Sequence, residues 1–193
     1  MGHREQLLRG AIQCLYERGY TRTTARDIVA ASGTNLASIG YHYGSKDALL
    51  TSAMVQALGD WGDALREATH NVEGDDPLSR MEAIWTGVID SVRQNPTLWT
   101  ASSEIYTEAF HQEELRERLQ EAYRESRPWF AQMTLGEAPG EKGPSDERVA
   151  KAVGSLVLAI VSGLSVQWLL DPDDAPTAAE LVAALRTVLA VSS

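Results

Sequence analysis

The chain has a single cysteine and few basic residues, and each scarcity excludes a class of protein. Cys14 alone cannot build a disulfide framework within one chain. No basic segment followed by an apolar run and a cleavage site opens the sequence, so we expect a cytoplasmic protein. With 193 residues, 44% of them hydrophobic, the chain can bury the core of one or two domains. Cys14 is interpreted as a small buried hydrophobic residue.

The basic residues are outnumbered, with 17 Lys and Arg against 27 Asp and Glu and a net charge of -10. This balance argues against a polyanionic partner, because binding phosphates requires positive charge. The deficit is uneven, however: residues 1–50 hold six basic and four acidic residues, hence +2, and the remainder carries -12. The six basic residues are Arg4, Arg9, Arg18, Arg22, Arg26 and Lys46. This asymmetry favours a protein whose N-terminal part alone contacts a polyanion.

Long hydrophobic runs are nearly absent, and the one exception has two interpretations. Residues 152–170 contain no charged side chain over nineteen positions, close to the length that spans a bilayer. Serine, glycine and glutamine dilute this run, and a helix buried in an oligomer interface tolerates them. We adopt the interface interpretation and expect no membrane partner; a membrane span is the alternative.

Strand patterns and internal repeats are also missing, whereas helical spacing recurs from end to end, so the sequence predicts an all-α protein. Capping signals at Thr24, Asn35 and Asp76 mark helix starts, and Pro128 is expected to kink or interrupt a helix. Residues 137–145 are expected to form a mobile loop. The expected helices cover residues 4–18, 24–31, 35–43, about five turns from 45, 77–92, 96–110, 113 up to Pro128, 146–170 and 177–191.

Two of these helices, at residues 24–31 and 35–43, are short and joined by a tight turn, which fits a helix-turn-helix. On the second, Ile39 and Tyr43 are placed to supply the core contact. The other arc has almost no bulk along its middle and consists of Leu36, Ala37, Gly40 and Tyr41. Such a face lets a backbone approach base edges in the major groove. The alternative is a packed helix that ends at Gly40 beside an ordinary surface tyrosine.

Polar side chains around these helices are placed to donate to phosphates. His42 lies near the end of the second helix, and Lys46 falls in the first turn of the next one. Thr24 and Thr34 stand at helix starts, where backbone amides assist anion binding. The pattern therefore predicts a rim of phosphate contacts around the bare arc.

The segment RTTARDIVAASGTNLASIGYHYGSKDALL, residues 22–50, resembles the N-terminal DNA-binding domain of the TetR family of bacterial transcription regulators, above all in its ending YHYGSKDALL. The resemblance covers residues 4–58. It implies an all-α fold in which a three-helix helix-turn-helix domain is joined by a long helix to a C-terminal helical domain that binds a ligand and dimerises. We place the two domains at residues 1–48 and 49–193.

Carried over by position, the resemblance implies that operator-contacting residues lie around the bare arc and that Thr24 contacts a phosphate. Two residues depart from the family pattern: Thr34 stands where valine is frequent in the turn, and Gly40 stands where a larger residue is common. The predicted DNA-binding residues are Thr24, Thr34, Asn35, Leu36, Ala37, Gly40, Tyr41, His42 and Lys46.

The resemblance also implies the function and the assembly. We expect a ligand-responsive repressor that binds a palindromic, double-stranded DNA operator as a homodimer and is released by a small molecule. Residues 146–170 and 177–191 of two subunits would form a four-helix interface, in which Gly154, Gly163, Ser155 and Ser162 permit close approach. Effector binding would move the long helix that starts near Ser45. No cofactor or metal is expected.

The C-terminal part is rich in aromatic residues, which could line an apolar cavity between helices. For each one taken singly, a plain core position is the alternative. The polar groups expected beside such a cavity are Glu104, Glu108, His111 and Gln167. The predicted ligand-binding residues are Trp61, Trp85, Trp99, Tyr106, Phe110, Tyr123, Trp129 and Trp168.

Two rival functions are weighed against this hypothesis. An enzyme is disfavoured, because no nucleophile motif, glycine-rich phosphate loop or metal-ligand spacing organises the histidines, the cysteine and the carboxylates. The second rival is a DNA-binding scaffold without an effector, which a filled C-terminal core would favour.

Overall fold

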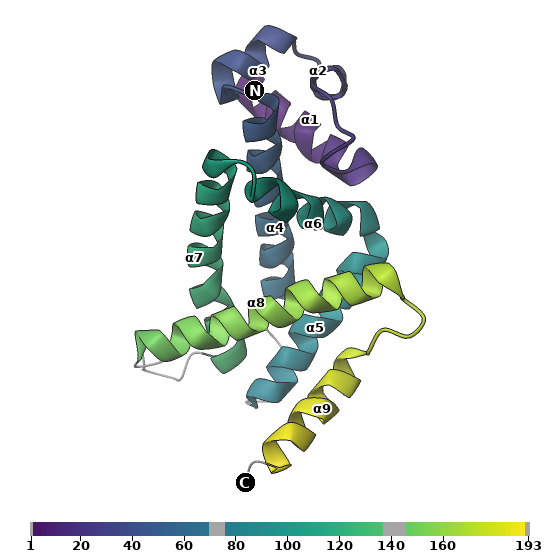
Figure 1. The fold of residues 1–193 in the computed structure, drawn as a ribbon, viewed down its shortest axis with the longest axis vertical. Helices are drawn as coiled ribbons and strands as arrows, with labels where there is room; N and C mark the ends of the chain where they lie inside the picture. Colours follow the sequence, from purple (N-terminus) through teal and green to yellow (C-terminus); the bar gives the residue numbers. More distant parts are fainter. Residues whose placement is uncertain (1, 70–75, 137–145, 192–193) are drawn as a thin grey trace. The chain divides into compact units, whose positions relative to one another are not determined.

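The computed structural model describes residues 2–69, 76–136 and 146–191, and within these ranges all regular secondary structure is helical. The all-α prediction is confirmed. Residues 137–145, expected to form a loop, lie outside the described residues. In chain order the helices are α1 (His3–Arg18), α2 (Ala25–Ser32), α3 (Leu36–Tyr43), α4 (Lys46–Thr69), α5 (Pro77–Gln94), α6 (Pro96–Ala109), α7 (Glu113–Leu135), α8 (Glu147–Leu170) and α9 (Ala178–Val191) (Figure 1).

The helices belong to two compact units, and the division between them falls within α4. The first unit comprises residues 1–62 and 95–122, and the second comprises residues 63–94 and 123–193. The first unit therefore adds α6 and the start of α7 to the N-terminal helices. The predicted boundary after residue 48 also falls within α4, but no local signal in the sequence indicated that α6 would join the N-terminal helices.

Local hydrogen bonds set the ends of the short helices, as the capping signals predicted. The Oγ1 of Thr24 accepts from the Asp27 amide at 3.2 Å, and an Asp27 carboxylate oxygen accepts from the Thr24 amide at 2.9 Å. Gly33 ends α2 with a φ of 65°, which a side chain would strain. The Asn35 side chain accepts from the Ser38 amide at 3.0 Å and thereby starts α3. These bonds are made within four residues, so sequence alone could foresee them.

The core of the first unit is built from α1, α2, α3, the first half of α4, α6 and the start of α7. Helices α1, α2 and α3 and the start of α4 are gathered together in Figure 1. Cys14 is 2% exposed within this core, so its predicted burial is confirmed. A Cβ at Gly10 would come within 2.8 Å of Ser32, so the absence of a side chain lets α1 and α2 approach closely. The largest fully buried side chains of this core include Leu7, Leu15, Ile28, Leu49, Leu50, Met54, Leu98 and Ile105.

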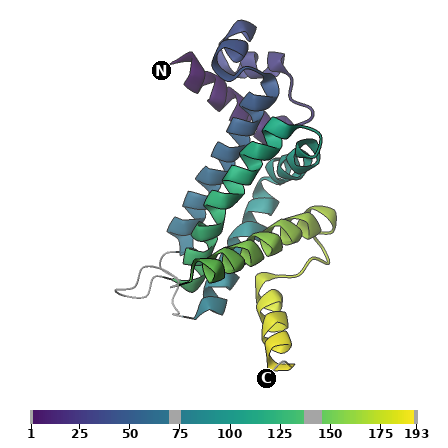
Figure 2. The same cartoon turned by 60° about the vertical axis from the view of Figure 1, so that its left-hand side comes forward.

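In the second unit α5 packs against both α8 and α9, and Figure 2 shows α8 leading into α9. Trp85 is 1% exposed and is the largest buried side chain of the unit. A Cβ at Gly154 would overlap the backbone carbonyl of Arg127, so α7 and α8 cross in close contact there. Gly154 was expected to permit approach between two subunits, but the structure uses it within one chain.

Helix α7 runs from Glu113 through Pro128 to Leu135, so the interruption that was one of the two expected effects of Pro128 does not occur. Proline has no amide hydrogen, so the carbonyl four residues earlier, on Arg124, loses its helical partner. Arg124 and Pro128 are both exposed. Water can therefore satisfy that carbonyl, and the helix continues.

Candidate nucleic-acid interface and effector region

The predicted bare face of α3 is exposed in the structure. Tyr41 is 86% exposed and Leu36 is 52% exposed. Between them Ala37 is exposed, and a Cβ placed on Gly40 would meet nothing within 4 Å. The backbone of α3 is thus open to a partner along the middle of this face. An exposed, low-bulk helix face of this kind matches the form that a major groove admits.

The opposite side of α3 holds the helix in place. Ile39 is 5% exposed within the core, and Tyr43 packs against the same core from its edge. Both predicted core contacts are confirmed. Between the two faces, the rings of Tyr41 and His42 meet edge to face with centroids 4.8 Å apart. This contact limits the directions that the exposed tyrosine can take.

Three of the predicted DNA-binding residues are engaged in caps and turns through their side chains. The Thr24 hydroxyl donates to an Asp27 carboxylate oxygen at 2.6 Å, and the hydroxyls of Thr34 and Ser32 lie 2.7 Å apart. The hydrogen bonds from Thr24 hold the pKa of Asp27 below its ordinary value. Asn35, as described above, caps α3. The local roles of these residues are shown, whereas their contacts with DNA stay a prediction.

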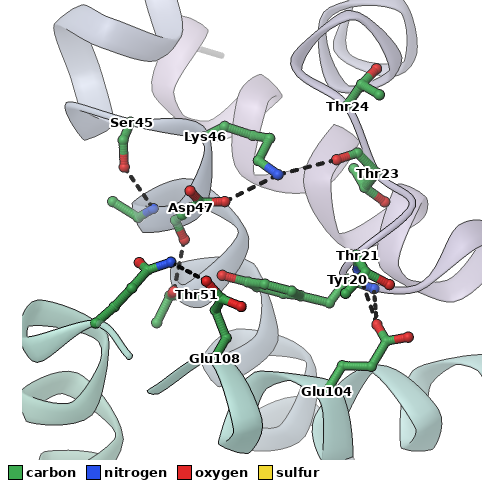
Figure 3. A network of polar contacts seen from close by, with 12 residues as sticks. Tyr20, Thr21, Thr23, Thr24, Ser45, Lys46, Asp47, Thr51, Glu104 and Glu108 are labelled. Atoms are coloured by element: carbon green, nitrogen blue, oxygen red, sulfur yellow. Dashed lines mark hydrogen bonds and ion pairs between the residues drawn. The ribbon is translucent and has the colours of Figure 1, made fainter. Parts of the chain in front are cut away.

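Lys46 is directed toward protein groups rather than freely into solvent (Figure 3). Its Nζ lies 3.1 Å from an Asp47 carboxylate oxygen and donates to the Thr23 carbonyl at 3.4 Å. Its side chain is 32% exposed. A phosphate contact would therefore require this ammonium group to exchange partners, so its predicted role in DNA binding stays a prediction.

A carboxylate on α6 binds the turn that follows α1, a contact that no local signal predicted. One Glu104 oxygen accepts from the backbone amides of Tyr20 at 3.1 Å and Thr21 at 3.0 Å (Figure 3). Gly19 precedes these amides with a φ of 84°. Burial, followed by the nearby Asp47 carboxylate, raises the pKa of the Tyr20 phenol to about 12. Glu104 thus joins α6 to the helices that carry the reading face.

The other polar groups expected beside a cavity are placed differently. The Glu108 carboxylate accepts from Gln112 one turn later, and Figure 3 shows it near the Tyr20 phenol. His111 is exposed just after α6, and the exposed Gln167 donates to the Gly163 carbonyl at 3.4 Å. Glu104 and Glu108 thus bind different partners within the first unit, and Gln167 belongs to the second unit.

The eight aromatic residues predicted to bind a ligand are divided equally between the two units. In the first unit, Trp61 of α4 and Trp99 of α6 meet edge to face with centroids 5.1 Å apart. Tyr106 is half-buried, whereas Phe110 is 78% exposed at the end of α6. The Trp61–Trp99 pair therefore joins two helices of the first unit through an aromatic contact.

In the second unit three of the predicted aromatic residues lie beneath arginine side chains. The guanidinium carbons of Arg66, Arg93 and Arg127 lie 5.2, 5.8 and 5.9 Å from the ring centroids of Trp129, Trp168 and Tyr123, respectively. A guanidinium over an aromatic face occupies the position that a cationic ligand would take.

The indole N–H groups of Trp168 and Trp85 differ in their hydrogen bonding. The Trp168 Nε1 donates to the Pro176 carbonyl at 3.0 Å. The buried Trp85 Nε1, in contrast, has no acceptor among the described residues.

Helices α8 and α9 leave apolar side chains exposed in the single chain. These side chains belong to Val149, Leu156, Val166, Leu170, Val188, Leu189 and Val191. A Cβ at Gly163 would meet nothing within 4 Å. By length and composition α8 could cross a membrane, which is weak evidence, and 28% of its most apolar stretch is buried. Most of that stretch is therefore uncovered.

Comparison with known families identifies both parts of the chain. The family model described as "Bacterial regulatory proteins, tetR family" matches residues 7–53, and the one described as "BetI-type transcriptional repressor, C-terminal" matches residues 77–191. The HTH-type transcriptional regulator BetI of Stenotrophomonas maltophilia (strain R551-3) is 33% identical over 119 residues, or 62% of this chain. This chain spans 60% of that relative's length.

Solved structures share the fold. A TetR transcription regulator from Haloarcula marismortui ATCC 43049 superposes with a TM-score of 0.63 at 24% identity, covering 96% of this chain and 93% of its own. A protein of Saccharomonospora viridis, solved in complex with choline, superposes with a TM-score of 0.62 at 21% identity, covering 95% and 93%. The matched families are transcription regulators and not enzymes, in agreement with the sequence analysis. Because the second family model alone covers more than half of the chain, this protein belongs to the TetR family of bacterial transcription regulators, with a C-terminal domain of the BetI type.

Proposed function

We propose that this chain is an effector-responsive repressor that binds a palindromic operator as a homodimer in the cytoplasm. The observation that carries the proposal is the exposed face of α3, where Gly40 is open and Tyr41 is 86% exposed. Packing of the core does not require an exposed apolar face on α3, so this face is better explained as a binding surface. The α3 face would enter the major groove, with Leu36 and Ala37 against bases and Tyr41 against a base or a phosphate.

The assembly would be a dimer through α8 and α9. Their exposed apolar side chains, among them Leu156 and Leu189, would be covered by the same helices of a second copy. Two copies also strengthen operator binding, because the two reading helices engage half-sites about one helical turn, ~34 Å, apart. Residues 1–50 carry a net charge of only +2, so one copy should bind DNA weakly and the second copy should increase operator affinity strongly.

The effector would bind among aromatic side chains, and choline is the first compound to test. The structural relative solved with choline motivates this choice. A quaternary ammonium ion requires aromatic faces. Guanidinium groups already lie over one face each of Tyr123, Trp129 and Trp168. The other predicted ligand-binding residues are Trp61, Trp85, Trp99, Tyr106 and Phe110. Phe110 is the least suitable of them, because a residue 78% exposed cannot enclose a ligand.

The contacts of the first unit suggest how effector binding would reach the DNA. Trp61 belongs to α4 and Trp99 to α6, so a ligand that separates this pair would displace both helices. Through Glu104, α6 holds the turn after α1, and α4 follows directly on α3. A coupling free energy of about 1–3 kcal/mol would change operator affinity ~5- to 150-fold.

Selection of DNA from a randomised double-stranded pool tests the proposal. We expect the wild-type protein to enrich one palindrome and the Tyr41→Ala variant to lose it, with an unchanged melting temperature because Tyr41 is exposed. Tyr16→Ala, an exposed tyrosine on α1, is the matched control and should retain the palindrome. Recovery of no enriched sequence by the wild-type protein would contradict the proposal. Loss of operator binding on adding choline would identify the effector class; full retention would exclude choline but not DNA binding.

A further inference from the structure

Arg4, in the first turn of α1, is fixed to the last residue of α3 by two contacts. The Tyr43 hydroxyl donates to the Arg4 backbone carbonyl at 2.9 Å. The Arg4 guanidinium carbon lies 5.6 Å from the centroid of the Tyr43 ring. Backbone and side chain of Arg4 are therefore held by the same tyrosine, so this exposed arginine has fewer orientations than a free surface side chain.

The position of Tyr43 on α3 determines which surface Arg4 borders. Tyr43 follows Gly40 by three residues and Leu36 by seven, and these spacings place residues on neighbouring positions of one helix side. Leu36 forms one edge of the bare face, and Gly40 lies next to it. Tyr43 thus marks the rim where the bare face meets the core, and the guanidinium of Arg4 lies against that rim.

The charge of Arg4 is also less compensated than that of Arg18 and of Lys46. Arg18 pairs with Asp27 at 3.4 Å, and Lys46 pairs with Asp47. In the described parts of the chain no ion pair joins Arg4 to a carboxylate, although Glu5 follows it in the same helical turn. A planar, always charged guanidinium without a carboxylate partner is suited to bind the oxygens of a phosphate group.

We propose that Arg4 of each subunit binds a backbone phosphate of the operator, at the edge of the groove that α3 enters, and that Tyr43 is its positioning residue. The inference rests on the proposed function and adds a contact outside the nine residues that the sequence predicted. A phosphate contact contributes affinity and register but carries no base preference. Variants of Arg4 should therefore bind the same palindrome more weakly.

The salt dependence of binding measures this contact directly. The dissociation constant for the selected palindrome is determined between 50 and 200 mM KCl for the wild type, Arg4→Gln, Arg4→Lys and Arg9→Gln. Each phosphate contact contributes about 0.9 to the slope of log affinity against log salt, so losing two per dimer should lower the slope by about 1.8. Across this fourfold salt range Arg4→Gln should then lose about 12-fold less affinity than the wild type. Arg4→Lys should largely restore the slope.

Arg9 supplies the matched control, because it is an exposed arginine on the same helix for which the described residues show no ion pair. Arg9→Gln should leave the slope near that of the wild type. An equal decrease for Arg9→Gln would mean that the slope reports only the net charge of the head, and this result would overturn the assignment of a contact to Arg4.

The role of Tyr43 is tested by a double-mutant cycle. Tyr43→Phe keeps the ring and removes the hydroxyl that donates to Arg4. It should weaken operator binding several-fold in the wild-type background and much less in the Arg4→Gln background, with melting temperatures measured beside it. Equal losses in both backgrounds would show that Tyr43 acts independently of Arg4 and would remove its positioning role.

The two proposals fail in different ways. If the wild type binds its palindrome and Arg4→Gln keeps the full salt slope, the inference about Arg4 is wrong and the proposed function stands. If the wild type selects no palindrome, the proposed function is wrong, and the Arg4 contact falls with it.

Discussion

Two surfaces of this molecule, the bare face of α3 and the uncovered side of α8 and α9, both expose apolar side chains, yet their surroundings differ. On α3, Leu36 and Tyr41 flank small residues, and hydroxyl, amide and basic groups stand at the helix ends. On α8, Leu156 and Leu170 belong to a stretch without any charged residue from 152 to 170. The first surface suits a polyanion with apolar groups on its bases, and the second suits another apolar surface. Exposure alone therefore does not distinguish them; the neighbouring charges do.

The glycines of the two surfaces extend the comparison. Gly40 on α3 and Gly163 on α8 are both open, since an added Cβ would meet nothing within 4 Å. Gly154, also on α8, faces the backbone of Arg127 within the same chain. An open glycine in a helix weakens that helix by roughly 1 kcal/mol relative to alanine. A partner that approaches the backbone closely at these positions would offset that cost.

The largest expected effect comes from placing a charge on the α8 surface. Leu156 is 54% exposed, so Leu156→Glu should fold but should bury an unpaired carboxylate in the proposed dimer interface. We expect a monomer by analytical ultracentrifugation and operator affinity reduced by about 100-fold or more, because the two half-sites no longer reinforce each other. Lys151→Glu, on an exposed position of the same helix, should remain dimeric. A monomeric variant with full operator affinity would contradict the interface.

A pair of alanine substitutions separates the two uses of glycine in α8. Gly154→Ala should lower the free energy of unfolding by about 1–3 kcal/mol, because the new methyl group meets the Arg127 backbone. Gly163→Ala should raise it by up to about 1 kcal/mol in the single chain, where the position is open. Chemical denaturation measures both. Should Gly163→Ala weaken the dimer while the monomer is stabilised, a second subunit approaches at that glycine.

On the α3 surface, Gly40→Ala should change stability and binding in opposite directions. The free protein has room for the methyl group, so its melting temperature should rise slightly. Operator affinity should fall about 10-fold if the α3 backbone approaches the base edges. Fluorescence anisotropy with the selected palindrome measures the affinity. Unchanged affinity would mean that the bare face stays at a distance from the bases.

The smallest expected effect concerns the pH dependence of the α2 cap. The hydrogen bonds from Thr24 lower the pKa of Asp27, so its carboxylate stabilises the folded state above the unfolded pKa, about 3.8. That contribution is lost as the pH falls through the lower folded-state pKa. Asp27→Asn should therefore lower the melting temperature at pH 7, and the difference from the wild type should shrink toward pH 3. Asp63→Asn controls for the loss of one surface charge. A difference that does not vary with pH would exclude the titration of this cap.

Much of the fold could be predicted because its signals are local. The caps at Thr24 and Asn35 and the helix end at Gly33 involve groups within four residues, and the sequence identified all three. The face of α3 followed from helical periodicity, since Ile39 had to point inward if the helix packed at all. The TetR resemblance then supplied the function, which periodicity alone does not.

The remaining contacts depend on residues far apart in the chain. Glu104 accepts from the amide of Tyr20, 84 positions away, and the sequence analysis had assigned this carboxylate to a ligand cavity. Arg4 lies over Tyr43, 39 positions away, and was absent from the predicted DNA-binding residues. Nothing in the sequence near these residues shows which helices will pack together. In the sequence, Arg4 is distinguished only as one of the six basic residues among residues 1–50.

The single thiol of the chain, on Cys14, can report how often the N-terminal DNA-binding helices open. Cys14 lies in the core of the first unit and is 2% exposed, and burial raises the pKa of its thiol. A thiol reagent can therefore reach it only when the helices around this core separate. The rate of its modification therefore counts the openings of the DNA-binding helices in an unmodified protein. Measured with and without operator DNA, that rate would show how far the DNA-binding helices are already ordered before the DNA binds.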